Sequence, residues 1–252
     1  MNISKKLLSV AGCDLSCKKI TMIGDDLTNT AYFVSCRIDD AADITYDDTL
    51  VDILSGSELE YYSCVRAAKR KKDYLFGRAA AKIALGLLMP GCAAIIGTGV
   101  FKQPIVRGCD AAVSISHSVD CFSALAFMPE YPCAIDVECV DNRLGDYWQE
   151  FVDADELQLA ADIGISMPAA YTILWSAKEA MSKATGTGLL TPLSVYKVSG
   201  LYTSNGMIYI QYANFKQFIC RSYVNAEKVF SMVCPSVYSC IEVIDVYLKD
   251  TF

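Results

Sequence analysis

The sequence predicts an α+β fold made of two similar halves, each a small antiparallel sheet packed against one long helix. Two long amphipathic segments, over 73–89 and 168–184, are each followed by short runs typical of antiparallel strands. This order repeats on either side of Met128–Pro132, where two prolines in five residues interrupt any regular element. We therefore expect an N-terminal extension over 1–28, a first half over 29–130 and a second half over 131–252.

The long helix of the first half is predicted by apolar pairs that recur every four residues from Asp73 to Met89, where Pro90-Gly91 ends it. A helix should begin before it at Ser57, because Ser-Glu-Leu-Glu has the spacing of a capping box closed by Glu60. The other elements expected in this half are strands over 31–38, 113–117 and 121–127 and a weak helix over 47–54.

The second half begins with the strand Ala-Ile-Asp-Val-Glu over 134–138. Asp153 and Glu156 form a second possible capping box, and the long helix that follows should end at Gly186. Asn205-Gly206 is the strongest hairpin signal in the chain. The strands expected after the helix cover 194–202, 207–212, 218–224 and 229–234.

Composition narrows the class of protein. The 252 residues are 53% hydrophobic, which is typical of a compact fold, and the net charge of −7 argues against a general nucleic-acid binder. The twelve cysteines are spread through apolar runs without a C-x-x-C pair, and His117 is the only histidine, so the usual zinc spacings are absent. We expect mostly buried free thiols in a reducing cytoplasm.

The N-terminus resembles a lipoprotein signal, because Lys5 and Lys6 precede an apolar run that ends at Cys13. That run is shorter than the roughly 7–15 residues of a signal core. We therefore favour a chain without a signal, and no apolar stretch approaches the length of a membrane span.

Two acids in the strand over 134–138 need an explanation. Asp136 and Glu138 should point to the same side, with Cα atoms about 6.6–7 Å apart. Two carboxylates side by side repel, and acids are depleted in strands, so something should offset the cost.

Three polar or aromatic side chains recur every four residues along the second long helix. Trp175, Glu179 and Lys183 share one face of it. A Glu four residues before a Lys is also an ordinary helix-stabilising pair worth about 0.3–0.5 kcal/mol, but this alternative does not account for the tryptophan.

A basic segment over 66–82 has seven Lys or Arg residues against Asp73. Lys71, Arg78 and Lys82 can line one flank of the first long helix and could bind an anion such as a phosphate. A solvated helix face is the alternative, and the segment alone favours it.

The remaining candidate residues could all bind a metal ion or a phosphate group. Asp136, Glu138 and Glu179 offer three hard oxygen ligands, and Lys183 offers a donor for phosphate. His117, at a strand end, could be either a ligand or a structural donor. Because magnesium is normally held by a few carboxylates and the phosphates of its substrate, this set suits a metal-bridged pyrophosphate.

Five motifs follow one another along the chain: FGRAAAK (76–82), KQP (102–104), SISHS (114–118), AIDVE (134–138) and WSAKEAMSK (175–183). Their order resembles that of the 4′-phosphopantetheinyl transferases of the two-half, surfactin-synthetase-activating type. The resemblance implies that family's fold and a post-translational modification, in which the phosphopantetheine arm of coenzyme A moves to a serine of an apo acyl or peptidyl carrier protein. It implies release of 3′,5′-ADP and no role for nucleic acid or membrane, and a monomer would suffice because both halves lie in one chain.

By motif match, the resemblance also implies roles for individual residues. Asp136, Glu138 and Glu179 would hold Mg²⁺ against the pyrophosphate. His117 and Lys183 would bind phosphate oxygens, and Lys183 would also stabilise the charge that develops during transfer.

The nucleotide end of coenzyme A would be bound by Lys71, Arg78 and the Gln103-Pro104 pair, with Ser116 contributing a nearby hydroxyl. The family often has Gly-Lys-Pro where this chain has Lys102-Gln103-Pro104. A non-catalytic coenzyme A or carrier-binding homologue is therefore the alternative.

The base that takes the serine proton is Glu179 or Glu156. We prefer Glu179, because Glu156 has a sufficient role as a helix cap.

Overall fold

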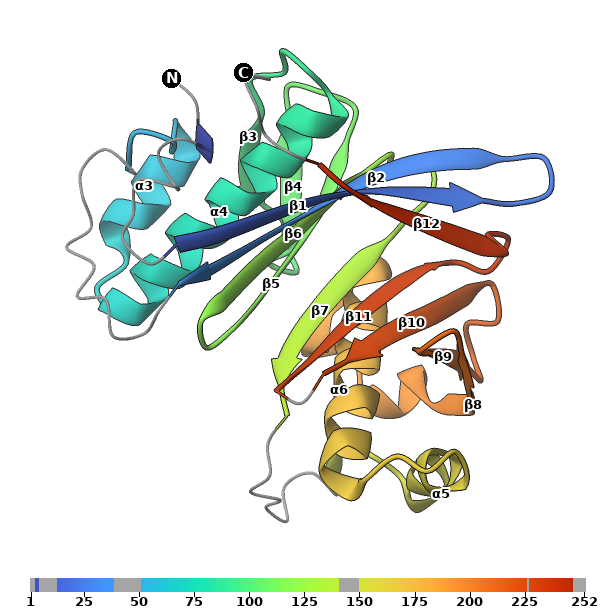
Figure 1. The fold of residues 1–252 in the computed structure, drawn as a ribbon. Coiled ribbons are helices and arrows are strands. Elements are labelled where there is room, and N and C mark those ends of the chain that lie inside the picture. The colour runs from blue at the N-terminus through green and yellow to red at the C-terminus, as the bar shows by residue number, and fades with distance from the viewer. Residues whose placement is uncertain (1–2, 5–12, 39–50, 141–149, 226, 247–252) are drawn as a thin grey trace. The chain divides into compact units, whose positions relative to one another are not determined.

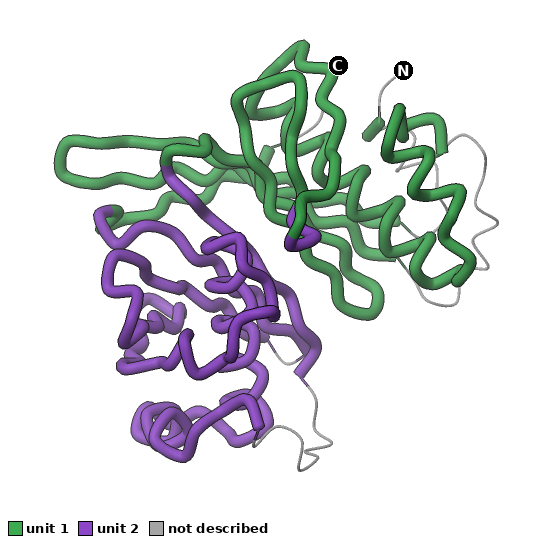
Figure 2. The backbone as a smooth tube through the Cα atoms, turned by 180° about the vertical axis from the view of Figure 1, so that it is seen from behind, with its two compact units in different colours: residues 1–100, 104–130, 238–252 green, residues 101–103, 131–237 purple. Residues whose placement is uncertain are grey.

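The computed structural model describes residues 3–4, 13–38, 51–140, 150–225 and 227–246. The chain divides into two compact units, which are coloured separately in Figure 2. Unit 1 comprises residues 1–100, 104–130 and 238–252, and unit 2 comprises residues 101–103 and 131–237. The main division falls after Glu130, within the segment Met128–Pro132.

Unit 1 is an antiparallel sheet with the long helix α4 on one face (Figure 1). Its elements are β1 (Cys13–Ile23), β2 (Thr28–Ile38), α3 (Ser57–Cys64), α4 (Ala68–Leu88), β3 (Ile95–Thr98), β4 (Pro104–Arg107), β5 (Ala112–Ser118), β6 (Cys121–Phe127) and β12 (Cys240–Asp245). The strand order is β12-β1-β2-β6-β5, and β3 and β4 form a separate pair. The core lies between helix and sheet, where the rings of Phe76 and Phe122 are 5.3 Å apart.

The helix α4 and the hairpin β5–β6 confirm the expectations for the first half. The helix starts at Ala68, earlier than predicted, because the basic residues before Asp73 are good helix formers. The prediction of a capping box at Ser57 is wrong, although α3 begins at that residue. Gly56 occupies the N-cap with φ 51°, and no side chain caps the helix.

Two strands of this sheet were not expected. Residues 13–23, which we had assigned to an N-terminal extension, form β1, and the C-terminal segment 240–245 pairs with it as β12. Polar residues such as Lys18 and Lys19 interrupt the apolar pattern of β1. Half of the helix expected over 47–54 lies outside the described residues.

Unit 2 has a five-stranded antiparallel sheet covered on one face by α6 (Figure 1). Its elements are β7 (Ala134–Cys139), α5 (Ala154–Asp162), α6 (Met167–Ala184), the 3-10 turns η2 (Gly188–Leu190) and η3 (Leu193–Tyr196), β8 (Val198–Ser204), β9 (Met207–Tyr212), β10 (Phe218–Val224) and β11 (Lys228–Pro235). The strand order is β7-β11-β10-β9-β8.

Local signals in unit 2 are confirmed. Asp153 and Glu156 form the reciprocal capping box at the start of α5. Asn205 and Gly206 have φ 50° and 74°, and positive φ at both central residues is what a type I′ hairpin turn requires. The strand expected from residue 194 starts only at Val198, because 193–196 form a 3-10 turn.

A buried ion pair ties the short helix to the long helix in unit 1. Lys82 of α4 lies 2.6 Å from Glu58 of α3 and also donates to the carbonyl of Ile53. The other oxygen of Glu58 accepts from the backbone N–H of Ile96 at 3.0 Å. The helical spacing predicts that Lys82 lies on an open basic flank of the helix. This prediction is wrong, because the Lys82 ammonium is buried against Glu58.

The same arrangement occurs in unit 2. Lys178 of α6 lies 2.7 Å from Glu156 of α5 and donates to the carbonyl of Phe151. The other oxygen of Glu156 accepts from the backbone N–H of Val198 at 2.7 Å. In each unit, a buried Lys–Glu pair thus joins the short helix to the long helix.

Among the described residues, no single helix combines the length and apolarity of a membrane span. The pair α5–α6 reaches both only when taken together, across a bend of 117°.

Candidate metal centre

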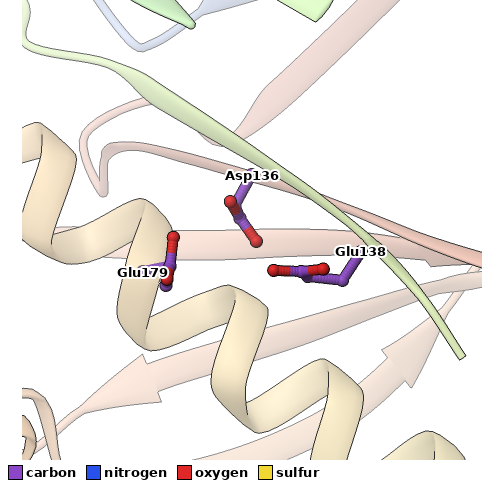
Figure 3. A group of neighbouring side chains, drawn as sticks. All are labelled: Asp136, Glu138 and Glu179. Atoms are coloured by element: carbon purple, nitrogen blue, oxygen red, sulfur yellow. The ribbon is translucent and has the colours of Figure 1, made fainter. Parts of the chain in front are cut away.

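Three carboxylates converge in unit 2 between β7 and α6. Asp136 and Glu138 come from the strand and Glu179 from the helix, and one oxygen of each lies within 4.8 Å of the others. Figure 3 shows the three side chains turned toward one another. Strand alternation places the two acids of β7 on one side, as the sequence predicted, and α6 covers that side. Asp136 is almost fully buried, and the other two are half-buried.

Lys183 supplies a positive charge to this cluster. Its Nζ lies 2.6 Å from Oδ1 of Asp136 and 3.6 Å from Oε2 of Glu179, one helical turn earlier. Burial lowers the pKa of Lys183, but the Asp136 and Glu179 carboxylates outweigh it and raise that pKa above its usual value. Lys183 is therefore a cation at neutral pH.

Glu179 has an unusual acidity. Burial raises its pKa, Asp136 and Glu138 add to the rise, and Lys183 opposes it, with a resulting pKa of about 7. The cluster thus resists carrying all three negative charges without a further cation.

Trp175 is tied to the same cluster. Its indole Nε1–H donates to Oε1 of Glu138 at 3.2 Å, and its ring lies 4.9 Å from that of Phe151. The contact explains why a tryptophan shares a helix face with Glu179 and Lys183. An ordinary Glu–Lys helix pair does not require it.

A buried chain of hydroxyls lies beside the site. Ser231 of β11 is directly opposite Asp136 in the sheet register, and its hydroxyl contacts Ser176 of α6 at 2.9 Å and Ser222 of β10 at 2.8 Å. These contacts fix the strand against the helix that carries Glu179. No local pattern in the sequence predicted this chain, because its members come from three separate elements.

The donor set fits a divalent cation. Three carboxylates and one ammonium leave two negative charges uncompensated when all the acids are ionised. Oxygen ligands without cysteine or histidine suit Mg²⁺ better than zinc. Asp136, Glu138 and Glu179 are the side chains that could hold it.

Glu156, the other candidate base, is fully engaged elsewhere. One oxygen contacts Lys178 at 2.7 Å and the Asp153 N–H at 2.8 Å, and the other accepts from Val198. The residue is completely buried. This geometry favours Glu179 as the base.

The residues expected at the nucleotide end lie mainly in unit 1. On α4, the Lys71 ammonium is 5.0 Å from the ring centre of Tyr62, and the buried Arg78 guanidinium is 4.6 Å from that of Tyr74. The Nε of Arg78 has no hydrogen-bond partner among the described residues. A buried donor of this kind is costly unless a partner binds.

The strand β5 carries the Ser-His pair of this group. Ser116 is buried and His117 is exposed, with its ring 6.2 Å from that of Phe122. The helix α4 packs closely against this strand. A Cβ added to Gly77 would lie only 3.1 Å from a methyl group of Ile115. Glycine at that position allows the approach of α4 to β5.

The Lys-Gln-Pro motif is split between the units. Gln103 belongs to unit 2, and its Oε1 is buried without a hydrogen-bond partner in the described part of the chain. Pro104 begins β4 in unit 1. The structure therefore brings together four of the predicted site residues in unit 2: Asp136, Glu138, Glu179 and Lys183. Five others belong to unit 1: Lys71, Arg78, Pro104, Ser116 and His117.

Comparison with known proteins gives a match that includes this cluster. Residues 132–232 match the family described as the 4′-phosphopantetheinyl transferase superfamily. Enterobactin synthase component D of Salmonella typhi is 32% identical over 130 residues, which are 50% of this chain and 53% of that protein. Its counterpart in Salmonella austin is 32% identical over 129 residues, with the same shares. The chain thus matches about half the length of these curated relatives. The resemblance to the family is confirmed for the segment with the motifs AIDVE and WSAKEAMSK: this chain is similar to 4′-phosphopantetheinyl transferases over the residues that include the three carboxylates and Lys183.

Proposed function

We propose that the protein transfers the 4′-phosphopantetheine arm of coenzyme A to a serine of an apo acyl or peptidyl carrier protein. The observation that carries this proposal is the convergence of Asp136, Glu138 and Glu179 beside Lys183, inside the segment that matches the superfamily. The two-half, surfactin-synthetase-activating type and a cytoplasmic location are part of the proposal.

The reaction forms a bond between the serine oxygen and the phosphorus that carries the pantetheine arm. The bond from that phosphorus to the bridging oxygen of the pyrophosphate breaks, and 3′,5′-ADP leaves. Reactions of this kind depend on positioning and charge neutralisation rather than on covalent catalysis. Mg²⁺ held by the three carboxylates would neutralise charge on the pyrophosphate oxygens.

The chain's own residues have separate tasks. The Lys183 ammonium, 2.6 Å from Asp136 in the structure, would donate to a phosphate oxygen and stabilise the charge gained by the leaving group. Glu179 would accept the serine proton, directly or through water.

Two of the side chains that would bind coenzyme A have unused hydrogen-bonding capacity. Arg78 has an unpartnered buried Nε, and Gln103 has an unpartnered buried Oε1 among the described residues. Lys71, Pro104, Ser116 and His117 complete the set by their positions in the motifs.

The test is release of 3′,5′-ADP, measured by chromatography after incubation with coenzyme A, Mg²⁺ and apo carrier proteins of several classes. Asp136→Asn should abolish release, whereas Asp162→Asn, on an exposed face of α5, should leave it unchanged. The alternative, a non-catalytic coenzyme A or carrier-binding homologue, is motivated by Gln103. It predicts coenzyme A binding without release of 3′,5′-ADP for any carrier.

A further inference from the structure

Two cysteines of unit 1 lie with their sulfurs in contact. Cys13 is the first residue of β1, and Cys36 lies near the end of the neighbouring strand β2. In the antiparallel register Leu15 is opposite Cys36, so Cys13 is the diagonal neighbour on the same face of the sheet. The distance between the two Sγ atoms is 3.1 Å.

The two thiols have different environments. Cys36 is completely buried in the core that packs against α4, whereas Cys13 is half-buried at the edge of that core. Their hydrogen bond lowers the pKa of Cys13, against the effects of burial and Asp14, and the same bond and burial raise that of Cys36. An accessible thiol beside a buried partner is the arrangement of a reactive cysteine and its resolving cysteine.

Other cysteines of the described chain are less well placed. Cys64 and Cys240 are exposed free thiols. Burial and a hydrogen bond to Cys92 raise the pKa of Cys109 to about 11, and burial raises that of Cys17 to about 11. The pair Cys92 and Cys109 is therefore the main competitor.

We propose that Cys13 and Cys36 are a reversible dithiol–disulfide modification site that a peroxide oxidises. The Cys13 thiolate attacks one peroxide oxygen and breaks the O–O bond. The resulting sulfenic acid keeps one oxygen, and the other leaves as water after protonation. The Cys36 sulfur then attacks the Cys13 sulfur, and the hydroxyl leaves with the Cys36 proton as a second water. The two sulfurs are oxidised and the peroxide is reduced.

Formation of the bond requires the sulfurs to approach and the backbone at one cysteine to shift, because the Cα atoms of diagonal neighbours are about 7–8 Å apart and a disulfide usually spans less. The sulfurs must close from 3.1 Å to about 2.05 Å. Cys13 can supply this movement because it begins its strand, whereas Cys36 is fixed in the core. The disulfide would close a covalent loop around the β1–β2 hairpin and should raise the melting temperature of the oxidised protein over that of the reduced protein.

The site is separate in composition from the carboxylate cluster of unit 2, and the proposal is independent of the transferase function. Neither cysteine is among the residues that we propose to hold Mg²⁺ or coenzyme A. A failed transferase assay would therefore leave this proposal unaffected.

The test is peptide mapping of the full chain after mild treatment with hydrogen peroxide. Free thiols are blocked with an alkylating reagent, and a tryptic digest is analysed by mass spectrometry without reductant. Trypsin cuts after Lys18 and Lys19, so a Cys13–Cys36 bond joins two otherwise separate peptides. The first of them also contains Cys17. The linked peptide should disappear on reduction and in Cys13→Ser, and persist in Cys17→Ser and in Cys64→Ser.

Three results would overturn the proposal. The first is a link that persists in Cys13→Ser and is lost in Cys17→Ser. The second is a link between Cys92 and Cys109 while Cys13 and Cys36 are still alkylated. The third is sulfinic or sulfonic acid at Cys13 without any link. Mapping of the unsubstituted protein decides the last two, so these results do not depend on whether a serine variant folds. Melting temperatures before and after reduction provide the second readout.

Discussion

Glu179 should make binding of Mg²⁺ dependent on pH near neutrality. The carboxylate must be ionised to bind the metal, and burial with the neighbouring acids raises its pKa to about 7 in the metal-free protein. About one-tenth of Glu179 is then ionised at pH 6 and about nine-tenths at pH 8. The apparent affinity should therefore rise about tenfold between these values, which corresponds to ~1.4 kcal/mol, and level off above pH 8.

Calorimetric titration with Mg²⁺ at several pH values measures this directly. In Glu179→Gln, binding should be weaker and the dependence on pH should disappear. Buffers of different ionisation enthalpy should reveal release of about half a proton per metal at pH 7. The reasoning would be refuted by an affinity that is constant or falls from pH 6 to 8, or by a slope that survives in Glu179→Gln.

Three other substitutions test the support of the site and of the fold. Trp175→Phe removes the N–H that holds Glu138, so the Mg²⁺ affinity should fall about tenfold in calorimetry; an unchanged affinity would show that the contact does not orient the ligand. Lys178→Met leaves the buried Glu156 without its cation and should lower the free energy of urea unfolding by about 3–5 kcal/mol, whereas a loss below about 1 kcal/mol would contradict the buried pair. Gly206→Ala forces an L-residue to adopt φ 74° and should cost about 1 kcal/mol in the same assay; no loss would argue against the type I′ turn.

Much of unit 2 followed from local patterns. Strand alternation placed Asp136 and Glu138 on one side, and helical spacing placed Glu179 and Lys183 on one face. These patterns did not bring the strand and the helix together. The grouping of Asp136, Glu138 and Glu179 came from the chemistry of the three acids and from the family resemblance, and the structure contains that cluster. Trp175 had been noted on this face, but its partner Glu138 could not be identified, because 37 residues separate the two in the sequence.

The predictions that were wrong concern elements whose contacts lie far away in the sequence. β1 pairs with β12 more than two hundred residues later, as in the ion pair of Lys18 with Asp245, and neither strand has a clean apolar alternation. Helical spacing placed Lys82 on a basic flank, but the buried Glu58 on the preceding helix binds it. Spacing identifies a face of a helix but not the element that covers it.

We propose that this chain loads carrier proteins from coenzyme A through the cluster around Asp136. The most direct measurement is the intact mass of apo acyl and peptidyl carrier proteins after incubation with the chain and coenzyme A, with Mg²⁺ or with a chelator. We expect at least one carrier to gain a single phosphopantetheine at its serine, only with Mg²⁺ and not with Asp136→Asn. No gain by any carrier, from folded protein that binds coenzyme A, or an equal gain with Asp136→Asn, would contradict the claim.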